Sequence, residues 1–172
     1  TPTSSDATQD VEMVDVDGDG FPDVVIGNAD APDLVILSGG SPLTAGDLAV
    51  PGDVLGADEL STRDIEVEDV NGDGVADFII ATSDGANKVI YGDKDRVGYS
   101  SVATELASAK AVGVADGQVD ESSQTVDVYD VDGDGNMDTV FGNTDQTSST
   151  YFNEGGELIL GQRGNSDAVG VK

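Results

Sequence analysis

Oxygen-bearing side chains recur at a fixed spacing in three short acidic segments. Each segment has Asp or Asn at positions 1, 3, 5 and 9 and Gly at position 6: Asp15-Val-Asp17-Gly-Asp19-Gly20-Phe21-Pro-Asp23, Asp69-Val-Asn71-Gly-Asp73-Gly74-Val75-Ala-Asp77 and Asp130-Val-Asp132-Gly-Asp134-Gly135-Asn136-Met-Asp138. Ca²⁺ prefers about six to eight hard oxygen ligands in a flexible shell, and alternate residues of a tightly curled backbone can point three side chains at one centre. The spacing therefore predicts three calcium sites.

Each predicted site combines four side chains with one main-chain carbonyl. Gly at position 6 permits the sharp turn, position 7 supplies its carbonyl oxygen, and position 9 closes the shell directly or through water. The predicted ligands are Asp15, Asp17, Asp19, Phe21 and Asp23; then Asp69, Asn71, Asp73, Val75 and Asp77; then Asp130, Asp132, Asp134, Asn136 and Asp138. Mg²⁺ suits such loops less well, because it demands stricter octahedral geometry and loses water reluctantly.

The residue at position 12 distinguishes these loops from an EF-hand. An EF-hand needs a bidentate Glu there, between two helices, whereas this chain has Ile26, Ile80 and Phe141. We therefore expect a calcium-bound β-hairpin. A solvated acidic turn is the simpler alternative, because Asp-Gly is a common hairpin signal. That alternative does not account for the same four oxygen-bearing positions in all three segments.

The overall composition excludes several classes of function. The chain of 172 residues has 35 acidic and 7 basic residues, a net charge of -28, and no Cys, His or Trp. It can therefore form no disulfide, no thiolate or imidazole metal site and no Ser-His-Asp triad. So few basic residues predict no nucleic-acid binding, and the short apolar runs predict no membrane insertion.

The acidic segments belong to a longer repeat. Three stretches, 11–26, 65–80 and 126–141, align without gaps. In each, alternating apolar residues before the acidic loop predict a half-buried strand, and a compact apolar run after it predicts a buried strand. Third strands are expected at 33–37, 87–91 and 149–152, and weaker fourth strands near 47–55, 99–106 and 157–160. Residues 102–112 are Ala-rich and could form a short helix instead.

This pattern predicts an all-β chain of β-propeller-like blades, each a four-stranded antiparallel repeat. We assign residues 1–56 to blade 1, 57–120 to blade 2 with an inserted loop, and 121–165 to blade 3. Residues 166–172 resemble the approach to each acidic loop and are expected to be the first strand of a further, incomplete blade. With no initiator Met at its start, the chain is expected to be a processed product or a fragment.

The loop followed by an apolar strand and Gly or Ala, as in Asp23-Val-Val-Ile-Gly27, resembles the FG-GAP/VCBS repeat family, and so does Tyr151-Phe-Asn-Glu-Gly-Gly156. The resemblance implies integrin-α-type propeller blades, with calcium in the hairpin between the first two strands and the side-chain ligands named above. Propellers close with about four to eight blades. Three blades therefore imply either a piece of a longer propeller or copies that assemble through open blade edges.

A non-enzymatic, calcium-binding structural or adhesion module, extracellular or at the cell surface, fits these features best. It is expected to form part of a larger propeller, or a self-assembling array or filament whose partners are other proteins or copies of itself. A calcium-dependent, lectin-like propeller that binds glycans through Tyr99 or Tyr129 is the alternative. Enzymatic glycoside hydrolysis by a carboxylate pair is disfavoured, because the regularly spaced carboxylates are committed to metal.

Overall fold

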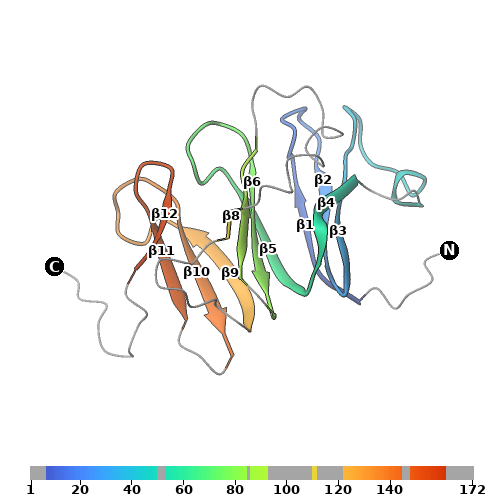
Figure 1. Ribbon diagram of the computed structural model, residues 1–172. Coiled ribbons are helices and arrows are strands. Elements are labelled where there is room, and N and C mark those ends of the chain that lie inside the picture. The colour runs from blue at the N-terminus through green and yellow to red at the C-terminus, as the bar shows by residue number, and fades with distance from the viewer. Residues whose placement is uncertain are drawn as a thin grey trace.

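The computed structural model describes residues 7–49, 53–84, 86–92, 110–111, 122–144 and 148–161, and these ranges form three four-stranded sheets (Figure 1). Neighbouring strands within every sheet pair antiparallel and follow one another in chain order. The predicted all-β, blade-like class is therefore confirmed. The three sheets do not close into a ring within the described ranges. Within the described ranges, no helix is long and apolar enough to cross a membrane.

The sheets lie side by side in chain order, and we call them blades 1, 2 and 3 (Figure 1). Blade 1 contains β1 (Ala7–Val14), β2 (Asp23–Ala29), β3 (Ala31–Ile36) and β4 (Asp53–Leu60). Blade 2 contains β5 (Thr62–Glu68), β6 (Asp77–Thr82), β7 (Lys88–Ile90) and β8 (Lys110–Ala111). Blade 3 contains β9 (Ser123–Tyr129), β10 (Asp138–Asn143), β11 (Ser149–Asn153) and β12 (Leu158–Leu160).

The fourth strands depart most from the sequence prediction. In blade 1 the first residues of the predicted 47–55 strand form instead a 3-10 turn, Asp47–Ala49, and β4 begins only at Asp53. The turn forms because the Asp47 carboxylate accepts hydrogen bonds from the amide and the hydroxyl of Thr44, both at 2.7 Å. This local capping competes with strand pairing. β4 ends at Leu60, within the segment assigned to blade 2, and the residue bounds of the blades stay predictions.

In the other two blades the fourth strands are short. The 157–160 strand of blade 3 is confirmed by β12. In blade 2 the predicted 99–106 strand lies outside the described residues, and so does most of the alternative 102–112 helix. Lys110 and Ala111, at the end of that range, form β8, which pairs with β7. The predicted 166–172 strand also lies outside the described residues.

Each junction between blades has its own apolar core. The core between blades 1 and 2 includes Val25 and Val35 from blade 1 and Phe78 and Ile80 from blade 2. At Gly27 the backbone of β2 comes so close to β5 that an added Cβ would lie 2.9 Å from the Thr62 methyl group. The core between blades 2 and 3 is built in the same way, and its members include Val70, Ile79, Val89, Val126, Phe141 and Tyr151. The blades are therefore held together by burial of successive sheet faces.

Two kinds of polar contact also repeat from one junction to the next. Asp10 of blade 1 accepts a hydrogen bond from the amide of Ile65 in blade 2 at 3.1 Å, and Asp64 of blade 2 accepts one from the amide of Val126 in blade 3 at 2.8 Å. These two pairs occupy equivalent repeat positions. The two junctions are therefore equivalent in their polar contacts as well as in their cores.

A hydroxyl group makes the second repeated contact. The Thr62 hydroxyl of blade 2 donates to buried Asp33 of blade 1 at 2.8 Å. At the equivalent repeat position, the side-chain amide nitrogen of Asn87 in blade 2 donates to the Ser123 hydroxyl of blade 3, also at 2.8 Å. Burial raises the pKa of Asp33 to about 6.

The first strands of the blades, β1, β5 and β9, bring acidic side chains together. Burial first, and then repulsion from Glu12, Asp64, Asp127 and Asp10, raise the pKa of Glu66 to about 7. The ordinary value is 4.5, so the folded protein holds a proton on Glu66 that the unfolded chain releases. The stabilisation is complete below about pH 4.5 and is lost as the pH rises through about 7.

We predict that Glu66→Gln raises the melting temperature at pH 8 by roughly 2–4 °C, after allowance for solvent screening of this partly exposed group. At pH 4.5 the substitution changes little, because Glu66 is already neutral there. Thermal melts of the parent and the variant at both pH values test this. Glu154→Gln, in the exposed turn after β11, is the matched control and shows no such pH-dependent gain. Equal shifts for Glu66→Gln at both pH values would contradict the prediction.

Candidate metal centres

The three acidic loops join the first strand of each blade to the second. They connect β1 to β2, β5 to β6 and β9 to β10, which are paired antiparallel strands. The glycines at positions 4 and 6 have positive φ in every loop; in the first loop Gly18 is at 75° and Gly20 at 90°. Such angles are costly for residues with a Cβ. These glycines let a short hairpin loop curl back on itself.

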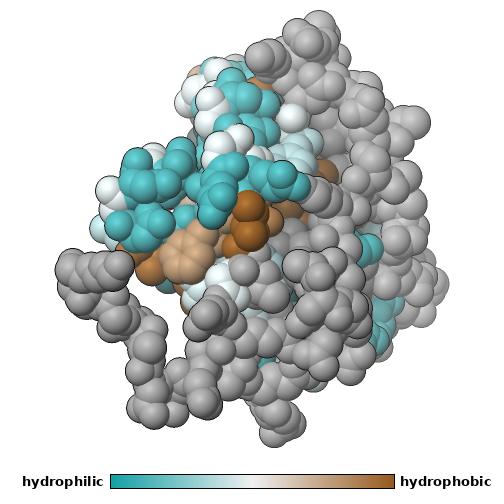
Figure 2. Space-filling view, turned by 60° about the vertical axis from the view of Figure 1, so that its left-hand side comes forward, coloured by the Kyte–Doolittle hydropathy of each residue, from teal (hydrophilic) through white to brown (hydrophobic). Residues whose placement is uncertain are grey.

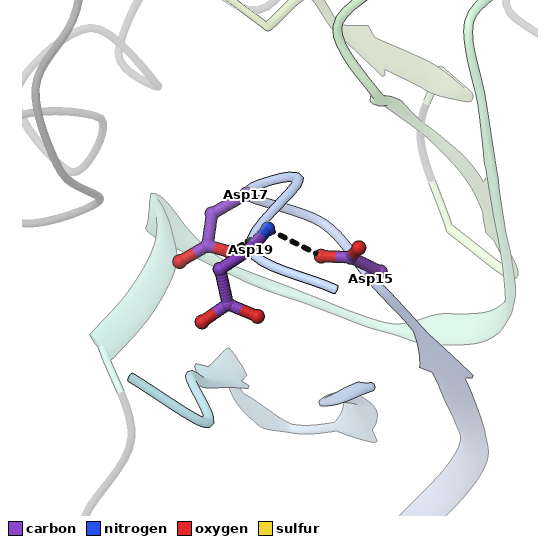
Figure 3. Close-up of side chains that lie close together, drawn as sticks. All are labelled: Asp15, Asp17 and Asp19. Carbon is purple, nitrogen blue, oxygen red and sulfur yellow. Dashed lines mark hydrogen bonds between the residues drawn. The ribbon is translucent and has the colours of Figure 1, made fainter. Parts of the chain in front are cut away.

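The carboxylate at position 1 organises the curl. Asp15 accepts hydrogen bonds from the amides of Asp19 at 3.0 Å and Gly20 at 2.9 Å, one on each oxygen. Asp69 and Asp130 make the same two contacts in their loops, at 2.8–3.1 Å. Figure 3 shows Asp15, Asp17 and Asp19 of the first loop, with the bond from the Asp19 amide to Asp15. The loop backbone therefore wraps around the position 1 side chain.

The side chains at positions 3 and 5 continue this pattern. Asp17 accepts from the amide of Asp19 at 3.1 Å, and Asp19 accepts from the amide of Phe21 at 2.9 Å. The position 7 residues Phe21, Val75 and Asn136 are thus fixed to the loop through their amides. Ligation by their carbonyl oxygens stays a prediction.

The carboxylate at position 9 is buried in all three loops, at 0–1% exposure. One oxygen of Asp23 accepts from the amide of Val16 in the loop at 2.9 Å, and the other accepts from the amide of Ser38, just after β3, at 2.7 Å. Asp77 makes the same contacts with Val70 and Gly92, and Asp138 with Val131 and Asn153. Position 9 therefore ties each acidic loop to the end of the third strand.

Two of the loops bring three carboxylates together. Oxygen atoms of Asp15, Asp17 and Asp19 lie within 4.8 Å of one another, and so do those of Asp130, Asp132 and Asp138. Both groups could hold a metal ion. Asp23 is not a member of the first group, nor Asp134 of the third.

The second loop has no such group of three carboxylates, and Asn replaces Asp at its third position. The Asn71 side-chain oxygen accepts from the Asp73 amide at 2.9 Å, and its side-chain nitrogen donates to the Asp73 carboxylate at 3.3 Å. Asp69 and Asp73 keep the same backbone contacts as their equivalents in the first loop. The second loop thus has the same frame with one charge fewer.

The candidate ligands and their charges fit a hard cation. All the side-chain atoms that could bind the ion at the predicted positions are oxygens, and none of the three loops contains Lys or Arg. Slight desolvation by the curled loop, with further repulsion from Asp23, Asp19 and Asp15, raises the pKa of Asp17, although its side chain stays exposed. Burial also raises the pKa of Asp77 to about 6. Each close pair of carboxylates costs about 1 kcal/mol at 4 Å even in water, and a bound cation reverses that sign.

Sequence reasoning missed the partners that these loops find elsewhere in the chain. The Ser38 hydroxyl and the Gly40 amide, beyond β3, donate to the Asp19 carboxylate. The Asn153 side chain of blade 3 donates to the carbonyl of Val70 in the second loop. The partner of position 9 always lies 15 residues further along the chain. This constant spacing could not be recognised in the sequence, because the partners Ser38, Gly92 and Asn153 donate through their backbone amides and have different side chains.

The two classes of acidic position are expected to respond differently to neutralisation. Asp23→Asn places an amide nitrogen against a buried backbone N–H, so it lowers the free energy of unfolding by about 2–4 kcal/mol even in chelator. Asp17→Asn removes an exposed, repelled charge, so in chelator it leaves stability unchanged or slightly higher. Denaturant unfolding with chelator present tests both variants. Equal destabilisation by the two would contradict separate roles for positions 3 and 9.

Comparison with known proteins agrees with this geometry. Residues 69–141 match the family model described as FG-GAP-like repeat. The matched segment begins at the first acidic residue of the second loop and ends in β10, after the third loop. No curated protein matches the chain significantly. Residues 69–141 of this chain are therefore similar to FG-GAP-like repeats, and this segment contains the second and third acidic hairpin loops, of which the third brings together carboxylates that could hold a metal ion.

Proposed function

We propose that the three hairpin loops bind Ca²⁺ and that the chain serves as a calcium-stabilised structural or adhesion module, without enzymatic activity, outside the cell or at its surface. The observation that carries the proposal is the gathering of three carboxylates within 4.8 Å in the first and third loops. The FG-GAP-like match, which spans the second and third loops, supports the same assignment.

Calcium is the cation that this donor set favours. The ligating groups are carboxylate, amide and main-chain oxygens on exposed loops, which suit a large ion with a flexible shell. Asp15, Asp17 and Asp19 are all exposed, so an ion can reach them from solvent. Extracellular fluid supplies calcium at the millimolar level that modules of this kind use. These points support the extracellular location.

A structural role follows from where the loops lie. The position 2 residues Val16 and Val70 are buried in the cores between blades, at 3% and 2% exposure. An ion that orders the loop therefore also fixes an apolar residue at a blade junction. The Asn153 contact with Val70 joins the end of β11 to the loop of the preceding blade. Calcium binding is thus expected to stabilise the packing of one blade on the next.

A lectin-like function is the second candidate, and one observation favours it. Tyr129 is 71% exposed directly before the third loop, as an aromatic platform for a sugar would be. Tyr99, the other candidate, lies outside the described residues. A glycan array probed with the parent and with Tyr129→Ala in calcium tests this idea. Binding that Tyr129→Ala removes would support the lectin function, and no binding by the parent would eliminate it.

Calcium is expected to raise the melting temperature strongly. A ligand at about 100 times its dissociation constant adds about 2.7 kcal/mol per site, so three sites predict a rise of more than about 10 °C. Thermal melts in millimolar Ca²⁺, in Mg²⁺ and in chelator measure it, and calorimetric titration gives the number of sites.

Matched variants make the test specific to the loops. Asp15→Asn combined with Asp19→Asn is expected to remove one site and part of the thermal shift. Asp84→Asn, an exposed position after β6, is expected to retain every site. Identical melting curves in calcium and chelator would refute the calcium assignment.

A further inference from the structure

Every blade has two faces, and the repeat positions show which residues belong to each. The leading face, turned toward the preceding blade, carries Ile65 and Val67 in blade 2 and Val126 in blade 3. The trailing face, turned toward the following blade, carries Val16 and Val25 in blade 1, and Val70 and Ile79 in blade 2. The same two faces therefore meet at both junctions within the chain.

The leading face of blade 1 is exposed along β1, whereas Val24 of β2 and Ile36 of β3, at the repeat positions of Phe78 and Ile90, are buried at 9% and 8% exposure. Val11 and Met13 are 51% and 67% exposed, although they occupy the repeat positions of Ile65 and Val67, which are 1% and 8% exposed. Val11 and Met13 are thus apolar although no preceding blade of the described chain covers them. Exposed side chains of this size leave apolar surface in water that burial against another face would stabilise.

The trailing face of blade 3 is exposed in the same way. Val131 is 48% exposed, whereas its equivalents Val16 and Val70 are 3% and 2% exposed. Val140 is half-buried, whereas Val25 and Ile79 are fully buried. Figure 2, in which the blade 3 end comes forward, shows apolar atoms at the surface among hydrophilic ones. Both ends of the row therefore present surfaces that elsewhere form blade junctions.

The polar positions at the two ends also remain suited to pairing. Thr8 of blade 1 occupies the same repeat position as Thr62 and Ser123. Across the internal junctions the Thr62 hydroxyl donates a hydrogen bond and the Ser123 hydroxyl accepts one. On the trailing side, Ser148 stands where Asp33 and Asn87 bind those hydroxyls, and Thr125 stands where Asp10 and Asp64 accept backbone amides. On the trailing face of blade 3, two neutral hydroxyls therefore occupy positions that hold a carboxylate or an amide, and a carboxylate, in the other blades, which lowers the negative charge of this face.

We propose that the trailing face of blade 3 docks on the leading face of blade 1 of a second copy of this chain, in the manner of the two internal junctions. The occupant is a second copy because the only surface shown to fit a leading face, within the described ranges, is a trailing face of this same chain. Such a head-to-tail contact uses two different patches, so it propagates into a ring or a filament. The proposal rests on the structural role proposed above and names its partner.

The test is the mass of the parent chain in millimolar Ca²⁺, measured by sedimentation velocity from micromolar to submillimolar concentration. Species at multiples of 17.5 kDa are expected. Met13→Gln on the leading face and Val131→Gln on the trailing face each weaken association about tenfold or more, because each buries an unpartnered amide. Leu48→Gln is the control substitution of the same kind: Leu48 is 54% exposed in the 3-10 turn, outside the strands that carry the two faces. It is expected to associate like the parent.

Mixing the two variants tests the head-to-tail geometry. Met13→Gln keeps an intact trailing face and Val131→Gln keeps an intact leading face, so their equimolar mixture is expected to form dimers and to stop there. A parent that stays monomeric at every concentration would overturn the proposal, and so would a contact that only one of the two variants weakens. Calcium titration of the same samples separates the two ideas, since a monomer that still binds calcium contradicts only the assembly.

Discussion

A buried carboxylate at the ninth loop position, Asp23, Asp77 or Asp138, holds each acidic hairpin loop to the third strand of its blade. One oxygen accepts from the loop backbone and the other from the backbone 15 residues further along. A buried carboxylate is costly unless its oxygens accept hydrogen bonds. The position of the loop and the path of the third strand are therefore fixed together. In the first and third loops the carboxylates at positions 1 and 3 gather on a loop that is already anchored, with position 5 in the first loop and position 9 itself in the third.

The position 9 contact also connects the acidic loops to the junctions between blades. The residue that donates to it from the loop, Val16 in blade 1 and Val70 in blade 2, buries its side chain in the next junction. The same short stretch of backbone thus carries the charged side chains of the loop and the apolar side chain that packs between the blades. A cation that relieves the repulsion in the loop would act on the packing through this stretch. Metal binding and folding are commonly coupled in this way.

Local features of the fold were predictable from the sequence, and non-local ones were not. The alternating strand before each loop and the Gly-rich turn depend on residues that are adjacent in the sequence. The strands that flank the loops lie where this pattern predicts them: β1, β2, β5, β6, β9 and β10. The start of β4 was not predictable, because the Thr44–Asp47 cap diverts residues that read as strand. The Asp10 and Asp64 contacts across blades were also missed, since both residues lie within β1 and β5 but directly before the apolar residues from which the strands were predicted, where a single acidic side chain is typical of solvent-exposed surface. The candidate ligands were named from spacing alone, but the anchoring role of position 9 required the third strand in place.

Amide hydrogen exchange measured by NMR, in calcium and in chelator, tests the central claim most directly. The informative amides are those of Ser38, Gly92 and Asn153, which donate to the position 9 carboxylates but belong to none of the acidic loops. If the loops bind calcium and transmit order through position 9, exchange at these three amides slows when calcium is added. Unchanged exchange at all three, in a sample whose loops are saturated with calcium, would contradict the account.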